Sequence, residues 1–284
     1  MSAITLSRSF DASPEQVWAA LTDKNQLKQW YFDIPDFAPV PGTVFDFYEG
    51  PAREYLHRGK VLAAEPNRRL QHTWMHPSHS KGESVLTWEI APDGERTKVT
   101  LHHEGTENFA GAGPAFSRAN YEAGWDALLN IQLRNHLYGI KKYRFEVDIN
   151  APAAKVWQLM WDAEGYKRWT APFSAGSYAE GNFEQGGEVR FLTPDGSGMY
   201  SKVLYTKAPQ KIILSHIGEI KNGKPLPVDA AAERWTGCLE SYTYTENNGV
   251  THLLAEVDIE ETHGDYMQQK FPPSMQEVKK MCEE

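Results

Sequence analysis

The chain of 284 residues is poor in cysteine and has no long apolar run. Cys238 and Cys282 lie far apart without the CxxC spacing typical of zinc sites, so we expect free thiols that are buried or partly buried. No stretch approaches the roughly 20 apolar residues that a membrane-spanning helix needs, and the first ten residues lack the pattern of a signal peptide. We therefore expect a cytoplasmic protein without membrane insertion.

Basic residues are also scarce, with 29 Lys and Arg against 38 Asp and Glu and a formal net charge of -9. Nucleic-acid binding needs concentrated Lys and Arg, so no nucleic-acid partner is expected. The sequence contains no phosphate loop, paired-carboxylate motif or triad spacing. We expect no cofactor, and no catalytic residue can be named.

What the sequence does contain is an internal duplication. Val17-Trp18 followed by Trp30 recurs 139 residues later as Val156-Trp157 followed by Trp169. Further matches keep their order, such as Gly59–Pro66 with Ser201–Pro209. An offset of about half the chain predicts two related domains, 1–139 and 140–284.

The first half reads as a strand, two short helices, a run of strands and one long helix. Ser13-Pro14-Glu15-Gln16 is a capping box that starts the first helix. Asp93-Gly94 predicts a hairpin turn, and Gly139 is a plausible C-cap. The strands are expected at 4–10, 43–48, 55–63, 70–75, 84–90 and 98–103, and the long helix over 121–137.

The second half repeats this order with one difference at its end. Pro272-Pro273 is expected to interrupt the last helix, and a capping box at Ser274–Glu277 to start a shorter one that covers less of the sheet. Asn248-Gly249 predicts the second hairpin. The strands are expected at 143–149, 188–192, 198–206, 211–216, 234–245 and 251–259.

This order of elements predicts an α+β fold. A curved antiparallel sheet with an apolar concave face needs a cover, and a long amphipathic helix supplies one. Where the sheet curves strongly, helix and side chains leave a cavity of ligand size.

Residues 4–137 resemble the heat-shock protein 90 ATPase activator homologues, START-like proteins of the SRPBCC superfamily. The resemblance is carried by Arg8–Trp18, Leu27–Trp30, Gly59–Leu70 and Gly124–Leu129. The second half is similar to a divergent member through Ala151–Trp157, Tyr166–Trp169 and Lys202–Leu204, but it lacks the Gly-Trp pair of the last helix. The resemblance implies two tandem helix-grip (START-like) domains, each a curved antiparallel sheet wrapped on a long C-terminal helix, complete in 1–139 and divergent in 140–284.

The superfamily includes carriers of lipids, hormones and polyketides and some cyclases, so the resemblance implies fold more than activity. We expect the first domain to bind a small hydrophobic molecule between sheet and helix, and binding is favoured over catalysis. The alternatives are a cyclase or hydrolase-type enzyme using the same cavity, and a co-chaperone or interaction module with a protein partner. The expected ligand-binding residues are Trp30, Phe45, Phe47, Arg58, Trp74, Trp88, His102, Trp125 and Leu128.

Histidines recur near these positions, at His72, His76 and His79. Imidazoles ligate zinc, but a strand followed by an exposed loop at Pro77 would spread these three apart, so no metal site is expected. Asp46 and Glu89 could also point inward from strands, where a single polar residue would orient a ligand as well as transform it.

Overall fold

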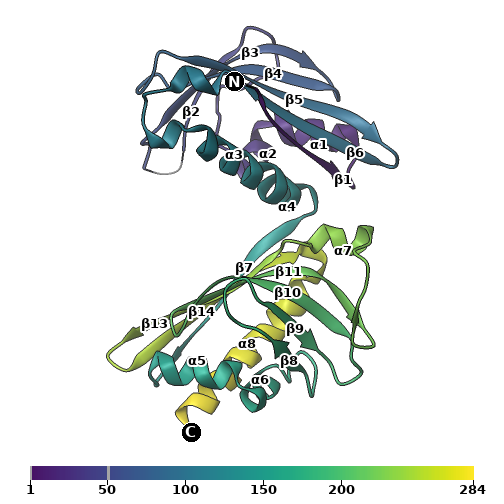
Figure 1. Ribbon diagram of the computed structural model, residues 1–284, viewed down its shortest axis with the longest axis vertical. Coiled ribbons are helices and arrows are strands. Elements are labelled where there is room, and N and C mark those ends of the chain that lie inside the picture. The colour runs from purple at the N-terminus through teal and green to yellow at the C-terminus, as the bar shows by residue number, and fades with distance from the viewer. Residues whose placement is uncertain (1, 50–51) are drawn as a thin grey trace. The chain divides into compact units, whose positions relative to one another are not determined.

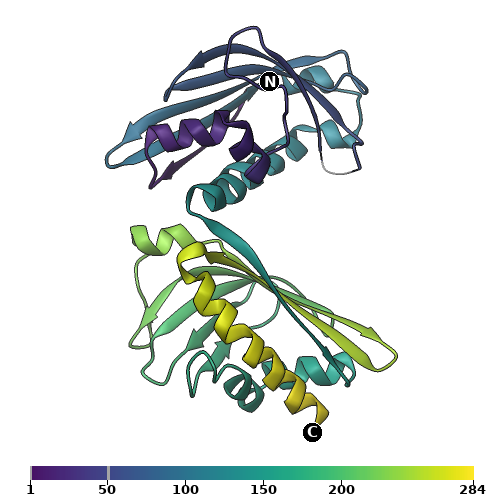
Figure 2. The same ribbon diagram turned by 180° about the vertical axis from the view of Figure 1, so that it is seen from behind.

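The computed structural model of the protein describes residues 2–49 and 52–284. The chain divides into two compact units, a first domain, Met1–Gly139, and a second domain, Ile140–Glu284. Each is a helix-grip domain of α+β class, in which a curved antiparallel sheet wraps on helices (Figure 1, Figure 2).

In the first domain, the described residues form a six-stranded sheet in the order β1-β6-β5-β4-β3-β2. Two helices follow the first strand, and a long helical segment closes the domain after two 3-10 turns. The elements are β1 Ile4–Phe10, α1 Pro14–Thr22, α2 Lys24–Trp30, β2 Val44–Tyr48, β3 Leu56–Glu65, β4 Arg69–Met75, β5 Glu83–Asp93, β6 Arg96–Glu104, η1 Thr106–Phe109, η2 Pro114–Phe116, α3 Arg118–Ala127, η3 Leu128–Leu133 and α4 Arg134–Leu137.

In the second domain, the described residues form an eight-stranded sheet in the order β7-β14-β13-β11-β10-β9-β8, with β12 paired to β11. A long C-terminal helix runs along it (Figure 2). The elements are β7 Ile140–Ile149, α5 Ala153–Trp161, α6 Ala163–Trp169, β8 Tyr178–Gly181, β9 Glu188–Leu192, β10 Gly198–Lys207, β11 Lys211–Lys221, β12 Lys224–Pro225, α7 Ala230–Trp235, β13 Leu239–Asn247, β14 Val250–Glu260 and α8 Glu261–Glu283.

The predicted helix cap and hairpin turns, which depend on residues close together in the sequence, are confirmed. Ser13 caps α1, and the reciprocal bond from its backbone to Gln16 completes the box. Both hairpin turns form, and the second has positive φ at Asn248 (52°) and Gly249 (80°), as a type I′ turn requires. The strand expected at 234–245 starts later in the structure. Residues 230–235 form α7 instead, and β13 begins at Leu239.

The duplicated tryptophans have the same structural role in both domains. The Trp30 indole donates a hydrogen bond of 2.9 Å to the carbonyl of Ala20 in the preceding helix. The Trp169 indole does the same to Met160 at 2.9 Å. Each indole therefore fixes a short helix against its neighbour, and this bracing explains why the spacing recurs.

The long helix of the first domain is not regular. Residues 128–133 form a π-helical segment between α3 and α4. The Arg8 guanidinium donates to the carbonyl of Asn130 inside this segment at 2.8 Å, which satisfies one backbone acceptor there. A π segment shifts the helix face by a fraction of a turn, and such segments often occur at functional sites.

The prolines do not interrupt the last helix, so that prediction is wrong. α8 runs unbroken through Pro272, Pro273 and the expected restart at Ser274. Both proline rings lie on the exposed face, where water can hydrate the carbonyls that lose an N–H partner. On the opposite face, Phe271 is buried and stacks on Phe145 at 4.3 Å between ring centroids. Burial of this face outweighs the missing backbone bonds, and α8 continues to Glu283.

Two further expectations concern the whole chain. Cys238 and Cys282 are buried and form no disulfide with each other, as predicted. Within residues 2–49 and 52–284, no helix combines the length and apolar character needed to cross a bilayer.

Candidate functional site

A cavity of about 430 Å³ lies in the first domain between the sheet and α3. Trp74 of β4, Trp125 of α3 and Leu128 of the π segment line it, so three of the nine expected residues meet there. Trp74 and Trp125 pack edge to face with their centroids 5.2 Å apart. The sheet and the long helix thus build the wall together.

Four other expected residues lie behind this wall. Trp30, Phe45, Phe47 and Trp88 are all at most 5% exposed and do not line the cavity. Trp88 packs edge to face on Trp125 at 6.3 Å between centroids, so it supports a lining residue from behind. These rings fill the core and hold the lining in place.

The remaining two expected residues, Arg58 and His102, lie on the outer face of the sheet. Both Arg58 bonds to the carboxylate of Asp46 are short, at 2.8 and 2.7 Å. These hydrogen bonds lower the pKa of Asp46. His102 contacts Thr5 at 3.0 Å. Because side chains alternate along a strand, the residues that face inward are the immediate neighbours, His57 and His103.

His57 and His76 form the polar part of the cavity wall, and reasoning from the sequence did not assign either of them to this site. Their ring centroids are 4.6 Å apart, and each residue is 2% exposed. Burial lowers the pKa of His76 to about 3, so its imidazole is neutral at physiological pH. The strand period of two would have found His57, because it shares the face of Val61.

The hydrogen bonds of His76 define its tautomer. Its Nε2 lies 3.2 Å from the Trp74 indole nitrogen, which can only donate, and 2.6 Å from the Tyr121 hydroxyl. Nε2 is therefore the acceptor, and the proton lies on Nδ1. That Nδ1 is buried and has no hydrogen-bond partner among the described residues.

A carboxylate lies beside this histidine pair. Glu49 Oε1 is 2.9 Å from His57 Nε2, and both residues line the cavity. The contact with His57 lowers the pKa of Glu49, although partial burial opposes it. Glu49 is half exposed and therefore lies toward solvent, whereas His76 lies deeper.

His103 links the helix to the sheet through a directional chain. The Trp125 indole donates to His103 Nδ1 at 2.9 Å, so the proton is on Nε2, which donates to Ser84 Oγ at 2.7 Å. Ser84 donates in turn to the carbonyl of Trp74 at 3.1 Å. The two lining tryptophans are thus connected by three buried hydrogen bonds, which fix the cavity wall.

None of these histidines forms a metal centre. Across the described residues, no group of three or more His, Cys, Asp or Glu side chains is placed to hold a metal ion. His79 lies in the exposed loop and packs on Tyr55 and Phe116.

The second domain contains a larger cavity, of about 540 Å³. Its wall includes Trp161, Trp169, His216 and Tyr242, and α8 contributes Phe271. The Gly-Trp pair of the first long helix is absent here, yet a cavity forms because the uninterrupted α8 spans the sheet. Both domains therefore have a space between sheet and helix.

Comparison with known proteins agrees with this architecture. Residues 11–137 match the model of the family described as activator of Hsp90 ATPase homolog 1-like protein. No curated protein matches the sequence.

Three solved structures to which this chain is similar differ in the extent of the match. A protein from Mesorhizobium loti is 25% identical over 48% of this chain and 96% of its own, with a TM-score of 0.41. The Aha1 dimer from Colwellia psychrerythraea is 23% identical over 49% and 98%, with a TM-score of 0.39. DynU16, a putative protein in the dynemicin biosynthetic locus, is 14% identical over 100% and 98%, with a TM-score of 0.41. The family match thus lies within the first domain and covers less than half of the chain.

Proposed function

We propose that the first domain binds a small hydrophobic molecule in the cavity between its sheet and α3. The observation that carries this proposal is the buried Nδ1–H of His76, which lacks a partner among the described residues and belongs to a residue that lines the cavity beside Trp74 and Trp125. An unsatisfied buried donor costs about 1–3 kcal/mol. A ligand with a carbonyl or similar acceptor would recover that cost.

The rest of the wall fits such a ligand. Trp74, Trp125 and Phe116 offer flat apolar surface, and Glu49 with His57 offers a polar end near solvent. Ligand sites typically combine apolar walls with a few placed polar groups, and a volume of about 430 Å³ suits a molecule of a few rings. The ligand is thus a largely apolar compound with one hydrogen-bond acceptor.

Gly124 offers a direct test. It lies in α3 in the cavity lining, and a Cβ added there meets no heavy atom within 4 Å. The Cβ of Gly124→Leu should therefore fit without a clash at the edge of the cavity, where the rest of the leucine side chain can obstruct a ligand, and leucine favours a helix over glycine by about 1 kcal/mol. We expect the variant to lose ligand in native mass spectrometry while its free energy of unfolding is unchanged or higher.

Ala119→Leu is the matched control, because Ala119 lies in the same helix, is exposed and does not line the cavity. It should retain ligand like the unaltered protein. If Gly124→Leu retains the ligand as well, binding at this cavity is excluded.

Glu49 and His57 favour acid–base catalysis as a second candidate function. A carboxylate 2.9 Å from an imidazole in a cavity wall can orient that imidazole as a proton acceptor. If the domain is an enzyme, the ligand recovered from it would have a changed mass. Glu49→Gln would then abolish this mass change, while the ligand would still bind. Recovery of the unchanged ligand supports binding alone.

A further inference from the structure

The cavity of the second domain has an unusual charge composition. Nine aromatic side chains contribute to its wall, together with four acidic residues. No Lys or Arg belongs to the lining among the described residues. The acidic residues are Glu219, Glu240, Asp258 and Glu260.

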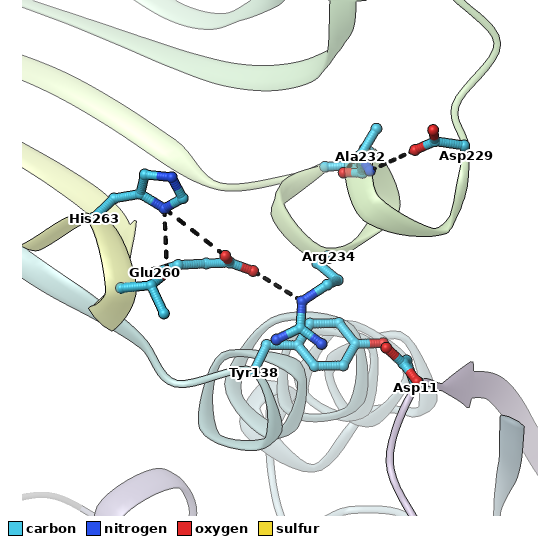
Figure 3. A network of polar contacts seen from close by, with 9 residues as sticks. Asp11, Tyr138, Asp229, Ala232, Arg234, Glu260 and His263 are labelled. Carbon is cyan, nitrogen blue, oxygen red and sulfur yellow. Dashed lines mark hydrogen bonds and ion pairs between the residues drawn. The ribbon is translucent and has the colours of Figure 1, made fainter.

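The negative charges of two of these four residues, Glu260 and Glu219, are balanced or screened by their surroundings. The Arg234 guanidinium pairs with Glu260 at 3.0 Å, and His263 Nδ1 lies 4.0 Å from the same carboxylate (Figure 3). Asp229 caps the short helix that carries Arg234 (Figure 3). Glu219 is exposed, so water screens its charge.

Glu240 is different, because no Lys or Arg among the described residues pairs with it. Its side chain is 19% exposed. One oxygen accepts a hydrogen bond from the Tyr242 hydroxyl, and the other lies 3.5 Å from His216 Nε2. A carboxylate this far from bulk water is costly without a cation beside it.

His216 does not supply that cation. Burial lowers its pKa, although Glu240 and Asp258 act in the opposite direction, so the imidazole is neutral at physiological pH. Ser201 holds the ring through Nδ1 at 2.8 Å. The other nitrogen, Nε2, faces the Glu240 carboxylate at 3.5 Å, and the ring belongs to the cavity wall.

Asp258 adds a second negative charge nearby. It is 8% exposed, and one of its oxygens accepts the backbone N–H of Leu239 at 3.0 Å. No Lys or Arg of the described chain pairs with it either. The wall therefore has two acidic groups and one imidazole, surrounded by aromatic rings such as Trp235, which packs on His216 at 6.4 Å between centroids.

We propose that the second-domain cavity binds a hydrophobic molecule that bears a protonated amine, with the ammonium group at Glu240 and His216. This inference extends the proposed ligand binding to the second domain and names the ligand class there. The ammonium N–H groups would donate to the Glu240 carboxylate, and aromatic faces attract a cation as well. The apolar body of the ligand would lie against Trp161, Trp169 and Phe271.

Three probes of the same shape and different charge test the proposal. Naphthylmethylamine is protonated near neutral pH, naphthylmethanol is neutral, and naphthoate is an anion. Each is titrated calorimetrically into the full chain carrying Gly124→Leu, the variant expected to obstruct the first cavity. We expect the amine to bind at least about tenfold more tightly than the alcohol, which corresponds to about 1.4 kcal/mol, and naphthoate to bind most weakly.

Glu240→Gln should remove the preference for the amine, because it keeps the shape and deletes the charge. Glu180→Gln is the matched control, since Glu180 lies in β8 of the same domain, is exposed and does not line the cavity. It should keep the preference. If Glu240→Gln does not fold, the proposal is tested by the ratio of amine affinity to alcohol affinity, measured in the chain that retains Glu240.

Equal binding of the amine and the alcohol would overturn the inference and leave a neutral ligand site. Binding of none of the probes would overturn the second-domain site as well. Neither outcome affects the first domain, because its ligand is measured separately with Gly124 in place.

Discussion

Three buried histidines of the first domain make its stability depend on pH. Burial lowers the pKa of His76 and of His103 to about 3, and that of His72 to about 4. In the unfolded chain each titrates near the ordinary value of about 6.5. Between these values the unfolded chain binds more protons than the folded one, so stability is present above about pH 6.5 and falls as the pH drops toward 4.

The magnitude follows from this difference. Lowering the pH from about 7 to about 5 protonates each histidine in the unfolded chain only, and the cost is about 2 kcal/mol for each residue. The three together remove about 5–6 kcal/mol, which is comparable to the whole stability of an ordinary domain. We therefore expect the first domain to be close to unfolding at about pH 5.

Pulse hydrogen exchange at increasing urea concentration measures this for each domain. Mass spectrometry separates peptides of β4–β6 from those of β11–β14, and so reports two free energies of unfolding. His103→Gln should lower stability at neutral pH, because it disturbs the bonds to Trp125 and Ser84. It should also reduce the pH dependence by about 2 kcal/mol.

His79→Gln is the control, because His79 is exposed in the loop and its replacement should leave the pH dependence unchanged. A loss below about 1 kcal/mol in the first domain between these pH values would refute the reasoning. If His103→Gln has the same pH dependence as the unaltered protein, the contribution assigned to His103 is refuted.

Two further predictions concern packing and helix structure. Gly59→Ala places a Cβ 2.3 Å from the ring of buried Phe45. We therefore expect its free energy of unfolding, measured in urea, to drop by about 1–3 kcal/mol. The control Lys60→Ala, at an exposed position, should change this free energy by less than about 0.5 kcal/mol. Replacing Pro272 and Pro273 by alanine should stabilise the second domain by at least about 1 kcal/mol, because two backbone bonds of α8 become available. A lower midpoint of thermal unfolding would show instead that the proline rings themselves are needed.

Features encoded by neighbouring residues were predictable from the sequence. The capping box at Ser13 and the hairpin at Asn248-Gly249 depend on side chains a few residues apart, and both form. Strand β9 has the bounds that its apolar pattern predicts, Glu188–Leu192. The repeat of Trp30 and Trp169 predicts two related folds, because each indole performs the same local bracing.

The candidate site was only partly predictable. Trp74, Trp125 and Leu128 line one cavity, because large apolar residues on facing elements meet in a core, and their role in ligand binding stays a prediction. Arg58 and His102 were placed on the wrong face, since a shift of one residue along a strand reverses the direction of the side chain. The strand period can identify an inward histidine, but it does not show whether that histidine lies in solid core or at a cavity.

The sequence by itself determined the duplication, the α+β class and the start of α1 at its capping box, because these depend on local pattern. Only the tertiary structure decided which side chains face a cavity, and it left His76 and Glu240 there without full pairing. It also decided that Pro272 and Pro273 stay within α8, because burial of the opposite face favours a continuous helix. These outcomes depend on contacts between residues far apart in the chain, which no local pattern records.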